Sequence, residues 1–248
     1  QLIHPTKTKY GGLEVATYTL DDVIAINRKR GSKGTTKRDA KIIAVNTQKG
    51  GTGKTFTATN IAAILSFAGG SIVNSDIKVL LVDLDSQGDV SIAMGLDGDG
   101  RTLEKVNEDA DPTIADLIDW TLEDDRYPED FRKLDPEEVI VKVSPTLDVI
   151  KGGLDIAEIN YFLNRFGLKK RKIEGTDVML PGELVVIKEA LGKLRDQYDF
   201  IILDLPPNIE TANVAALYAS DYVISPIELE FKCLKVAARN EEFLNRLV

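Results

Sequence analysis

Lys41–Leu65 has the sequence KIIAVNTQKGGTGKTFTATNIAAIL, in which three local patterns follow one another. The apolar run Ile42–Val45 predicts a buried strand, and the glycine-rich segment behind it predicts a loop. A helical repeat of apolar residues comes next, at Ala58, Ile61, Ala62 and Leu65. We expect this helix to end at Gly69-Gly70. Strand, glycine loop and helix in this order are the setting of a phosphate-binding loop.

The glycine loop has the residues that bind a polyphosphate. Glycines allow backbone N–H groups to turn around an anion, and the following helix adds the positive end of its dipole. Lys54 would then contact the β- and γ-phosphates, and the Thr55 hydroxyl would ligate Mg²⁺. The alternative is a turn between strand and helix without a ligand, and two further motifs argue against it.

A second motif, Val79–Asp89 (VLLVDLDSQGD), places two carboxylates at the end of another buried strand. Asp83 and Asp85 are two residues apart, so they point to the same side as long as the strand continues. A carboxylate at such a place can position the water that attacks a phosphate, or lie in the outer shell of the magnesium ion. Solvated acids at a strand end are the alternative.

The third motif is Tyr198–Pro207 (YDFIILDLPP). Its apolar strand ends at Asp204, and open α/β sheets bind their ligands at the carboxyl ends of the strands. Asp204 can therefore hold Mg²⁺, directly or through water, as a Walker-B acid. Pro206 and Pro207 stiffen a turn that could sense the γ-phosphate.

Taken together, the three motifs resemble those of the ParA family of plasmid and chromosome partition ATPases. Gln48 occupies the first glycine position of G-x-x-x-x-G-K-[ST], and Lys49 adds a second lysine, as in the deviant Walker A loop of ParA and MinD. In that class this lysine crosses a dimer interface to the partner's nucleotide. By the same resemblance Asp85, in a variant of D-x-D-P-Q-G-N, is the hydrolytic residue, and Asp83 supports it.

The resemblance also has departures. Ser86 and Asp89 replace the proline and the asparagine of the second motif, and Phe56 stands where the family commonly has a threonine near the α-phosphate. The third motif resembles the family's switch II, Y-D-x-I-I-I-D-x-P-P. Pro226 and Glu230 fit the family's P-x-x-x-E.

The resemblance implies an α/β fold with a mostly parallel sheet flanked by helices, and ATP and Mg²⁺ as cofactors. The catalytic residues that it implies are Lys49, Lys54 and Asp85. Magnesium would be held by Thr55, Asp85 and Asp204. The nucleotide would be bound by Lys49, Gly50, Gly51, Thr52, Gly53, Lys54, Thr55, Phe56, Asp83 and Pro207.

The function implied is that of an ATPase that forms an ATP sandwich dimer and hydrolyses ATP slowly. The dimer would bind DNA non-specifically, and a ParB-type centromere-binding partner would stimulate hydrolysis during partition. A helix and a basic linker before the ATPase core resemble the large plasmid type, which carries an N-terminal DNA-binding extension. The expected location is the cytoplasm, in association with the nucleoid.

Charge and motif positions divide the chain in two. Residues 1–40 are expected to form a helical segment, Thr19–Asn27 with Thr19 as N-cap, and a basic linker, Arg28–Arg38. Residues 41–248 would form the ATPase domain, which we expect to be incomplete at its C-terminus. Residues 1–41 contain nine Lys/Arg and four Asp/Glu, a net +5, whereas residues 42–248 contain 22 and 36, a net −14.

An acidic body does not attract nucleic acid over long distances, so DNA contacts must come from local basic patches. The amino-terminal arm is one candidate. Two further candidate patches are Lys169–Lys172, for which surface solubility is the alternative, and the set Lys232, Lys235, Arg239 and Arg246.

Other patterns predict the elements around the motifs. Trp120 is expected to be a packing residue. The predicted elements are a helix over Thr113–Trp120, a strand over Leu147–Ile150, a helix that ends near Phe166, a helix over Asn208–Ala219, a strand over Asp221–Ser225 and a last helix over Lys232–Leu247.

Composition excludes several classes of protein. The apolar fraction of 43% supports a core, and the single residues Cys233 and His4 exclude a disulfide framework and a cysteine or histidine metal cluster. The sequence has no apolar run of the ~18 residues that a membrane span needs, and no secretory signal is visible.

Two other readings of the motifs stay open. A membrane-cycling ATPase of the MinD type needs a C-terminal amphipathic anchor, and the last helix is too short and mixed in character for one. A DNA-binding repressor could use nucleotide only to set its conformation, although Asp85 argues for hydrolysis. A metallocluster carrier is less consistent with the sequence, because it needs cysteines.

Overall fold

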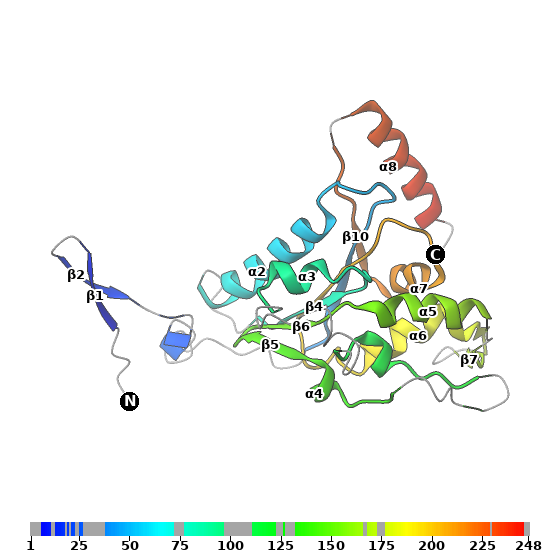
Figure 1. The fold of residues 1–248 in the computed structure, drawn as a ribbon, viewed down its shortest axis with the longest axis horizontal. Coiled ribbons are helices and arrows are strands. Elements are labelled where there is room, and N and C mark those ends of the chain that lie inside the picture. Colours follow the sequence, from blue (N-terminus) through cyan, green and yellow to red (C-terminus); the bar gives the residue numbers. More distant parts are fainter. Residues whose placement is uncertain are drawn as a thin grey trace, which may run out of the picture.

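A computed structural model gives the fold (Figure 1). The residues that it describes are 6–10, 13–17, 19, 21–22, 25–26, 38–71, 77–96, 111–122, 126, 132–165, 168–172, 177–228 and 230–245.

A six-stranded sheet forms the centre of the body, in the order β10-β3-β9-β4-β6-β5. Every neighbouring pair is parallel except β5 and β6, which are antiparallel. This confirms the predicted α/β fold with a mostly parallel sheet. The strands are β3 (Lys41–Val45), β4 (Val79–Asp83), β5 (Val141–Ser144), β6 (Leu147–Ile150), β9 (Phe200–Asp204) and β10 (Tyr222–Ile224).

Helices cover both faces of the sheet (Figure 1). One face carries α2 and the short α3, and the other carries α5, α6, α7 and a turn of 3-10 helix, η1. The last helix, α8, begins away from the sheet and runs back toward it. The bounds are α2 (Lys54–Ser71), α3 (Asp89–Ala93), η1 (Ile114–Leu117), α4 (Pro136–Val139), α5 (Leu154–Arg165), α6 (Gly182–Gly192), α7 (Thr211–Ala219) and α8 (Phe231–Leu244).

The two faces of the central strands bury separate clusters. Leu81 and Ile202 pack with α2 and α3, whereas Leu80 and Leu203 pack with the helices of the opposite face. Successive side chains of a strand point to opposite faces, and a sheet covered on both sides needs apolar residues at nearly every position. The continuous apolar runs of the second and third motifs are thereby explained.

The amino-terminal part contains a hairpin that the sequence analysis did not predict. Thr6–Tyr10 (β1) and Leu13–Thr17 (β2) pair as an antiparallel hairpin. Gly11-Gly12 between two alternating runs is a hairpin pattern that could have been recognised. Thr19 is the cap that was expected, because its hydroxyl accepts a hydrogen bond from the Asp22 N–H at 3.2 Å. Residues 27–37, which include most of the basic linker, lie outside the described residues.

Several predicted boundaries are corrected. The helix expected over 113–120 is only the 3-10 turn η1, with a capping box between Thr113 and Asp116. α2 continues through Gly69-Gly70 to Ser71, and α7 begins at Thr211 instead of 208. Residues 246–248, and with them Arg246, lie outside the described residues. Within those that are described, none of the helices combines the length and the hydropathy that a membrane crossing requires.

Trp120 is a packing residue, as expected. Its side chain is 1% exposed, and its indole N–H donates to the Ala115 carbonyl at 3.0 Å. The Phe162 ring of α5 lies 6.2 Å from its ring, between centroids. Trp120 therefore packs the η1 segment against α5, on the sheet face that also carries α6 and α7.

The entry into β3 is held by a cluster around Arg195, which we call the Arg195 clamp. The Ala40 N–H donates to the Arg195 carbonyl at 2.9 Å, and the Arg195 guanidinium donates to the Ala40 carbonyl at 3.1 and 3.2 Å. The same guanidinium contacts Asp221 at 2.8 Å, and Asp221 accepts the Ile42 N–H at 2.8 Å. The clamp joins the start of β3, the end of α6 and the start of β10.

The buried pair of Tyr198 and Asp148 offers a test of the core. The Tyr198 hydroxyl donates to the Asp148 carboxylate at 2.7 Å, and Lys78 is 4.0 Å from that carboxylate. Tyr198→Phe leaves a buried carboxylate without its nearest donor, so we expect a loss of about 1–3 kcal/mol in the free energy of unfolding. Urea denaturation measures it. Tyr161→Phe, at a side chain that is 55% exposed, is the control and should change it little.

Candidate nucleotide-binding site

The register of the sheet brings the three motifs together. β9 lies between β3 and β4, with Asp204 opposite Val45 on one side and opposite Asp83 on the other. The strands are parallel, so their carboxyl ends meet at one edge, where such sheets bind ligands. The glycine loop after β3, the acids after β4 and the acid that ends β9 therefore share one site.

The loop between β3 and α2 has the backbone of a phosphate-binding loop. Gly51 and Gly53 have φ angles of 76° and 79°, a left-handed conformation that favours glycine. A Cβ at Gly50, Gly51 or Gly53 would meet no atom within 4 Å, so backbone conformation rather than crowding explains the two left-handed glycines. The loop leads directly into α2 at Lys54, whose first N–H groups have no partner within the helix. An anion at this place would meet these donors and the positive end of the helix dipole.

Lys54 lies inside the site. It is 8% exposed, and burial lowers its pKa, while Asp204 and Asp85 act to raise it. A lysine that is partly removed from water and faces two acids keeps an ammonium where a polyphosphate would need a positive charge. Lys54 therefore lies near Asp85 and Asp204, two acids of the other motifs.

Asp204 is a buried carboxylate without a hydrogen bond of good geometry. Both of its oxygens are buried and unpaired. Burial raises its pKa to about 6, Thr55 and Lys54 act to lower it, and Asp85 and Asp89 act to raise it. A buried carboxylate whose oxygens lack hydrogen bonds is costly, and a bound cation lowers that cost. The residue therefore fits a metal ligand better than a structural one.

Asp83 has a different role from Asp204. It is 0% exposed, and its two oxygens accept hydrogen bonds from the Asp85 N–H at 2.9 Å and the Val90 N–H at 3.3 Å. Burial raises its pKa to about 7, the two hydrogen bonds act to lower it, and Asp204 and Asp85 act to raise it. Asp83 is thus a buried anchor for the turn that carries Asp85.

Asp85 reaches the site by a turn and not by continuation of the strand. The two acids were expected to point to one side as long as the strand continues, but β4 ends at Asp83, so that condition is not met for Asp85. A turn follows, in which the Gly88 N–H donates to the Asp85 carbonyl at 3.2 Å and Gly88 has a φ of 67°. Asp85 is nevertheless near Lys54 and Asp204, because its charge affects the pKa of both.

Gly152 is a site residue that the sequence analysis did not single out. A Cβ on Gly152 would lie 2.5 Å from the Asp85 carbonyl oxygen and 2.6 Å from the Asp83 carboxyl carbon. The backbone after β6 therefore closes against the two acids. Two glycines directly after a buried strand, in Lys151-Gly152-Gly153, are the sequence pattern that could have indicated this close approach of the backbone.

The turn after β9 is held by a buried asparagine that was also missed. The Asn213 side-chain amide donates to the Pro206 carbonyl at 3.1 Å and the Asn208 carbonyl at 2.6 Å, while the residue is 3% exposed. Pro207 itself is exposed. An asparagine among the apolar residues at the start of a predicted helix is the sequence pattern for such a contact, because its amide must find hydrogen-bond partners once it is buried.

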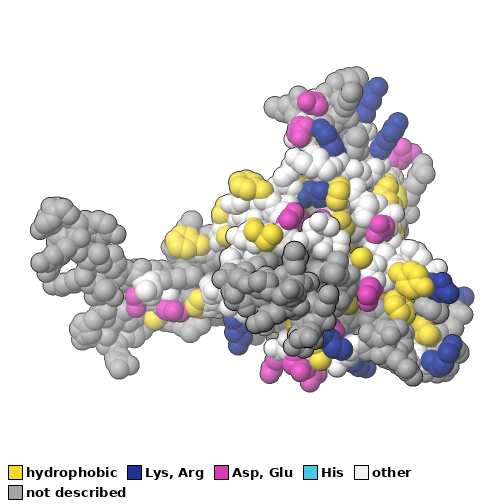
Figure 2. All heavy atoms as spheres, viewed as in Figure 1, with side chains coloured by type: hydrophobic (Ala, Val, Ile, Leu, Met, Phe, Trp, Pro, Cys, Tyr) yellow, Lys and Arg dark blue, Asp and Glu magenta, His cyan; other side chains and the backbone are white. Residues whose placement is uncertain are grey.

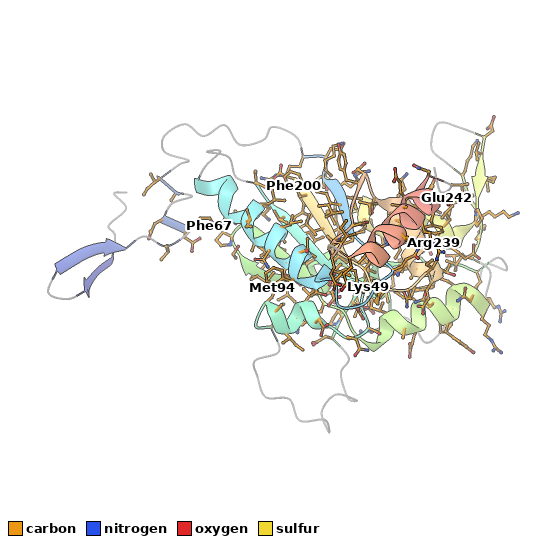
Figure 3. The ribbon with its side chains drawn as sticks, turned by 90° about the horizontal axis from the view of Figure 1, so that it is seen from above. Lys49, Phe67, Met94, Phe200, Arg239 and Glu242 are labelled. Carbon is orange, nitrogen blue, oxygen red and sulfur yellow. The ribbon has the colours of Figure 1, made fainter. Side chains whose placement is uncertain are left out.

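Lys49 and Phe56 do not join the cluster around Lys54. The Lys49 ammonium lies 2.6 Å from Glu228 and 3.8 Å from Glu230, both on the segment between β10 and α8 (Figure 3). Phe56 is 73% exposed on the first turn of α2. Glu228 was not predicted, because only the sheet order shows that β10 lies beside β3.

Comparison with known proteins identifies the family. Residues 40–245 match the family model AAA_31, described as an AAA domain. The Bacillus subtilis sporulation initiation inhibitor protein Soj is 30% identical over 163 residues, which are 64% of this chain and 49% of Soj. The ParA family protein of Mycoplasma pneumoniae is 29% identical over 163 residues, 64% of this chain and 50% of that protein. This chain belongs to the ParA family. It spans about half the length of these curated relatives.

Solved structures agree with the ParA-family fold. The ATP complex of a Cyanothece McdA variant has a TM-score of 0.61 at 21% identity, over 85% of this chain and 65% of that one. The likeness confirms a mostly parallel sheet flanked by helices.

A magnesium ion would find a sparse set of protein ligands in this ParA-family chain. Among the described residues, no three His, Cys, Asp or Glu side chains form a metal-binding group. Magnesium at nucleotide sites commonly takes one or two protein oxygens and completes its octahedron with phosphates and water. The unpaired carboxylate of Asp204 and the nearby hydroxyl of Thr55 fit that pattern.

The close approach at Gly152 predicts a strong effect of one methyl group. Gly152→Ala forces the backbone away from Asp83 and Asp85, so we expect a loss of about 1–3 kcal/mol in stability and weaker nucleotide binding. Urea denaturation and calorimetric titration with nucleotide measure the two. Gly153→Ala is the matched control, because its Cβ would lie 3.6 Å from Thr113, an ordinary contact. Gly153 directly precedes α5, so the cost is that of alanine in place of glycine before a helix, at most about 1 kcal/mol. Equal effects of the two variants would contradict the close approach.

The raised pKa of Asp204 predicts how stability depends on pH without magnesium. Between the ordinary value of 3.8 and about 6, the folded state holds a proton that the unfolded state releases. The free energy of unfolding therefore falls as the pH rises through this window. We expect Asp204→Asn to be more stable than the unchanged protein by about 1–3 kcal/mol at pH 8, and no more stable at pH 4. Urea unfolding in EDTA at both pH values measures this.

Asp196→Asn, at an exposed aspartate, is the control and should follow the unchanged protein at both pH values. A less stable Asp204→Asn at pH 8 would show that another group of the protein stabilises the carboxylate.

Proposed function

We propose that this chain is a Mg²⁺-dependent ATPase that forms an ATP sandwich dimer, binds DNA non-specifically and acts in plasmid or chromosome partition with a ParB-type partner. The observation that carries the proposal is the meeting of Lys54, Asp85 and Asp204 at one edge of a parallel sheet, beside a glycine loop. Within it, residues 41–248 are the ATPase unit and residues 1–40 are the amino-terminal segment, whose last residue, Ala40, is held to the body by the Arg195 clamp.

Each residue of the site has a role that its surroundings support. The loop backbone from Gly50 to Gly53 and the Lys54 ammonium would bind the phosphates of ATP. Thr55 and Asp204 would hold the magnesium ion, directly or through water, and bound magnesium would neutralise charge on the phosphates. These contacts are mainly electrostatic, so they require a fixed arrangement more than covalent chemistry.

Asp85 would orient the water that attacks the γ-phosphate. Its carboxylate accepts the Gln87 N–H at 3.1 Å, and its own N–H is bound by Asp83. Two hydrogen bonds therefore fix the turn on either side of Asp85, and a water held by this carboxylate would keep its direction. Asp83, buried behind the turn, is a positioning residue in this scheme.

Lys49 would act in the partner's site. Its side chain is 37% exposed, and its ammonium lies 2.6 Å from Glu228, on the segment that follows β10. In the proposed dimer each Lys49 would contact the phosphates bound by the other subunit. The relationship to Soj and to the ParA family supports this role of the second lysine.

The candidate DNA patch at Lys169–Lys172 has acidic side chains close to it. Arg171 of β7 (Arg171–Lys172) lies 3.3 Å from Glu189 and 3.7 Å from Asp119, and Lys172 lies 2.8 Å from Asp177. β7 pairs with β8 (Met179–Leu180) in a small hairpin. These ion pairs lower the charge that the 169–172 patch offers to phosphate.

Helix α8 carries another candidate patch. Lys235 and Arg239 are exposed on it, as are Glu241 and Glu242, and Figure 2 shows Lys and Arg side chains together with Asp and Glu side chains on this projecting part of the molecule. A dimer would present the patch twice, and each neutralised phosphate makes binding steeper in salt. We therefore propose α8 as the main DNA contact, and nucleoid association as its result.

Three variants test the proposal together. Asp85→Ala should bind ATP and form a dimer that stays on DNA, because the attacking water loses its carboxylate. Lys49→Ala should bind ATP as a monomer and lose the hydrolysis that the ParB-type protein stimulates. For cations that act in trans, the loss in rate is about 10³–10⁵-fold. Lys142→Ala, at an exposed lysine of β5, is the matched control. Light scattering with ATP or ADP, hydrolysis rates and retention on DNA are the measurements.

A monomeric Asp85→Ala that binds ATP well would contradict its hydrolytic role. Normal dimerisation and hydrolysis by Lys49→Ala would contradict the action of this lysine in trans. An unchanged protein that stays monomeric with ATP would contradict the sandwich dimer itself.

A further inference from the structure

The two lysines of the glycine loop have different partners in the same chain. Lys54 is buried beside Asp204 and Asp85, whereas the Lys49 ammonium lies 2.6 Å from a Glu228 carboxylate oxygen. In Figure 3, Lys49 lies beside the beginning of α8. The loop therefore divides its two positive charges between its own site and a neighbouring segment.

Main-chain pairing explains why Glu228 is at this place. β10 is parallel to β3, with Ile224 opposite Val45, and the Asn46 N–H donates to the Ile224 carbonyl at 2.9 Å. The segment that follows Ile224 must leave the sheet at the same edge as the glycine loop. Glu228 is four residues along that segment, so its carboxylate reaches Lys49 without any rearrangement of the loop.

We propose that Glu228 is a positioning residue for Lys49: it holds the ammonium outside the subunit's own phosphate site and must be displaced when an ATP dimer forms. The inference rests on the proposed function for the dimer, but the Lys49–Glu228 contact itself does not. Glu228 touches neither the reacting phosphate nor the metal in this scheme and acts through the lysine.

The exposure of the pair makes it displaceable. The side chains of Lys49 and Glu228 are 37% and 42% exposed, and ion pairs in such surroundings shift an equilibrium by up to about five-fold. Such a contact is strong enough to bias where the lysine lies and too weak to hold it against a more highly charged anion. A buried ion pair could not be exchanged as easily, because one charge would be left without a partner.

The competition favours ATP over ADP. Glu228 offers one negative charge to Lys49, whereas the terminal phosphate of ATP, held by the partner subunit, offers more charge and several acceptor oxygens. ADP lacks that group, so it displaces Glu228 poorly. Since both subunits of a dimer must exchange the contact, removal of Glu228 should favour the dimer by up to about 25-fold.

Glu228→Gln tests the inference, with Glu230→Gln as the matched control. Both changes remove one charge from the same segment, but Glu230 is 3.8 Å from Lys49 and its side chain is 64% exposed. A sandwich dimer holds two ATP molecules, so a dimer favoured up to about 25-fold forms at an ATP concentration up to about five-fold lower. We therefore expect Glu228→Gln to dimerise at an ATP concentration about two- to five-fold lower than the unchanged protein, and to form some dimer with ADP. Glu230→Gln should shift the ATP concentration by less than about two-fold. Glu228→Asp keeps the charge, so the ATP concentration at which it dimerises should lie between those of Glu228→Gln and the unchanged protein.

Light scattering at a series of ATP and ADP concentrations gives the threshold. ATP affinity measured on dilute monomer should stay within about two-fold for Glu228→Gln, since Lys54 and the loop are unchanged. An unchanged or higher ATP threshold in Glu228→Gln would overturn the inference, as would an equal shift in Glu230→Gln.

A second measurement separates this inference from the proposed function. In nucleotide-free protein, acylation of Lys49 by an amine-reactive ester, followed by mass spectrometry, reports whether its ammonium is held. Glu228→Gln should raise labelling of Lys49 about two- to five-fold relative to Lys142. An unchanged ratio overturns the positioning role. An unchanged protein that never dimerises with ATP contradicts the proposed function, while the labelling ratio still decides whether Glu228 holds Lys49.

Discussion

The parallel pairing of β3, β9 and β4 is the constraint on which the site depends. With Asp204 opposite both Val45 and Asp83, no side chain of the site has to be brought in by a long loop. A shift of this pairing by one residue would turn every strand side chain to the opposite face. The same register that buries Leu81 and Ile202 against α2 therefore also determines where the acids lie.

Burial of two acids in one site is expensive, and the chain treats them in opposite ways. Asp83 is supplied with two backbone N–H donors, and its turn is closed by Gly152. Asp204 is left without such donors, although it is equally removed from water. One acid is thus built into the scaffold, while the oxygens of the other are left for the proposed magnesium ion. Such local violations of good packing are expected where a protein binds something.

The sequence predicted what depends on local pattern and failed where distant segments meet. The loop around Lys54, the strand end at Asp204 and the α/β class follow from periodicity, glycine content and motif spacing. The turn after Asp83 was missed because a strand pattern does not show at which residue the backbone bends. The contact of Lys49 with Glu228 could not be predicted from the sequence, because the two residues are 179 positions apart and meet only because β10 lies beside β3. The β1–β2 hairpin, in contrast, was predictable from Gly11-Gly12.

The Arg195 clamp has a mechanical consequence. Ala40, directly before β3, is bonded to Arg195 through both its N–H and its carbonyl group. The Asp221 carboxylate accepts the N–H of Ile42, the second residue of β3. A pulling force on the residues before Arg38 would act first on the contacts of Arg38 with Asp199 and Gln197, then on the clamp, and would reach the glycine loop only after these yield. Whatever residues 1–37 bind, tension on them is borne by α6 and β10 together. The nucleotide site is thereby shielded from load although it lies a single short strand away.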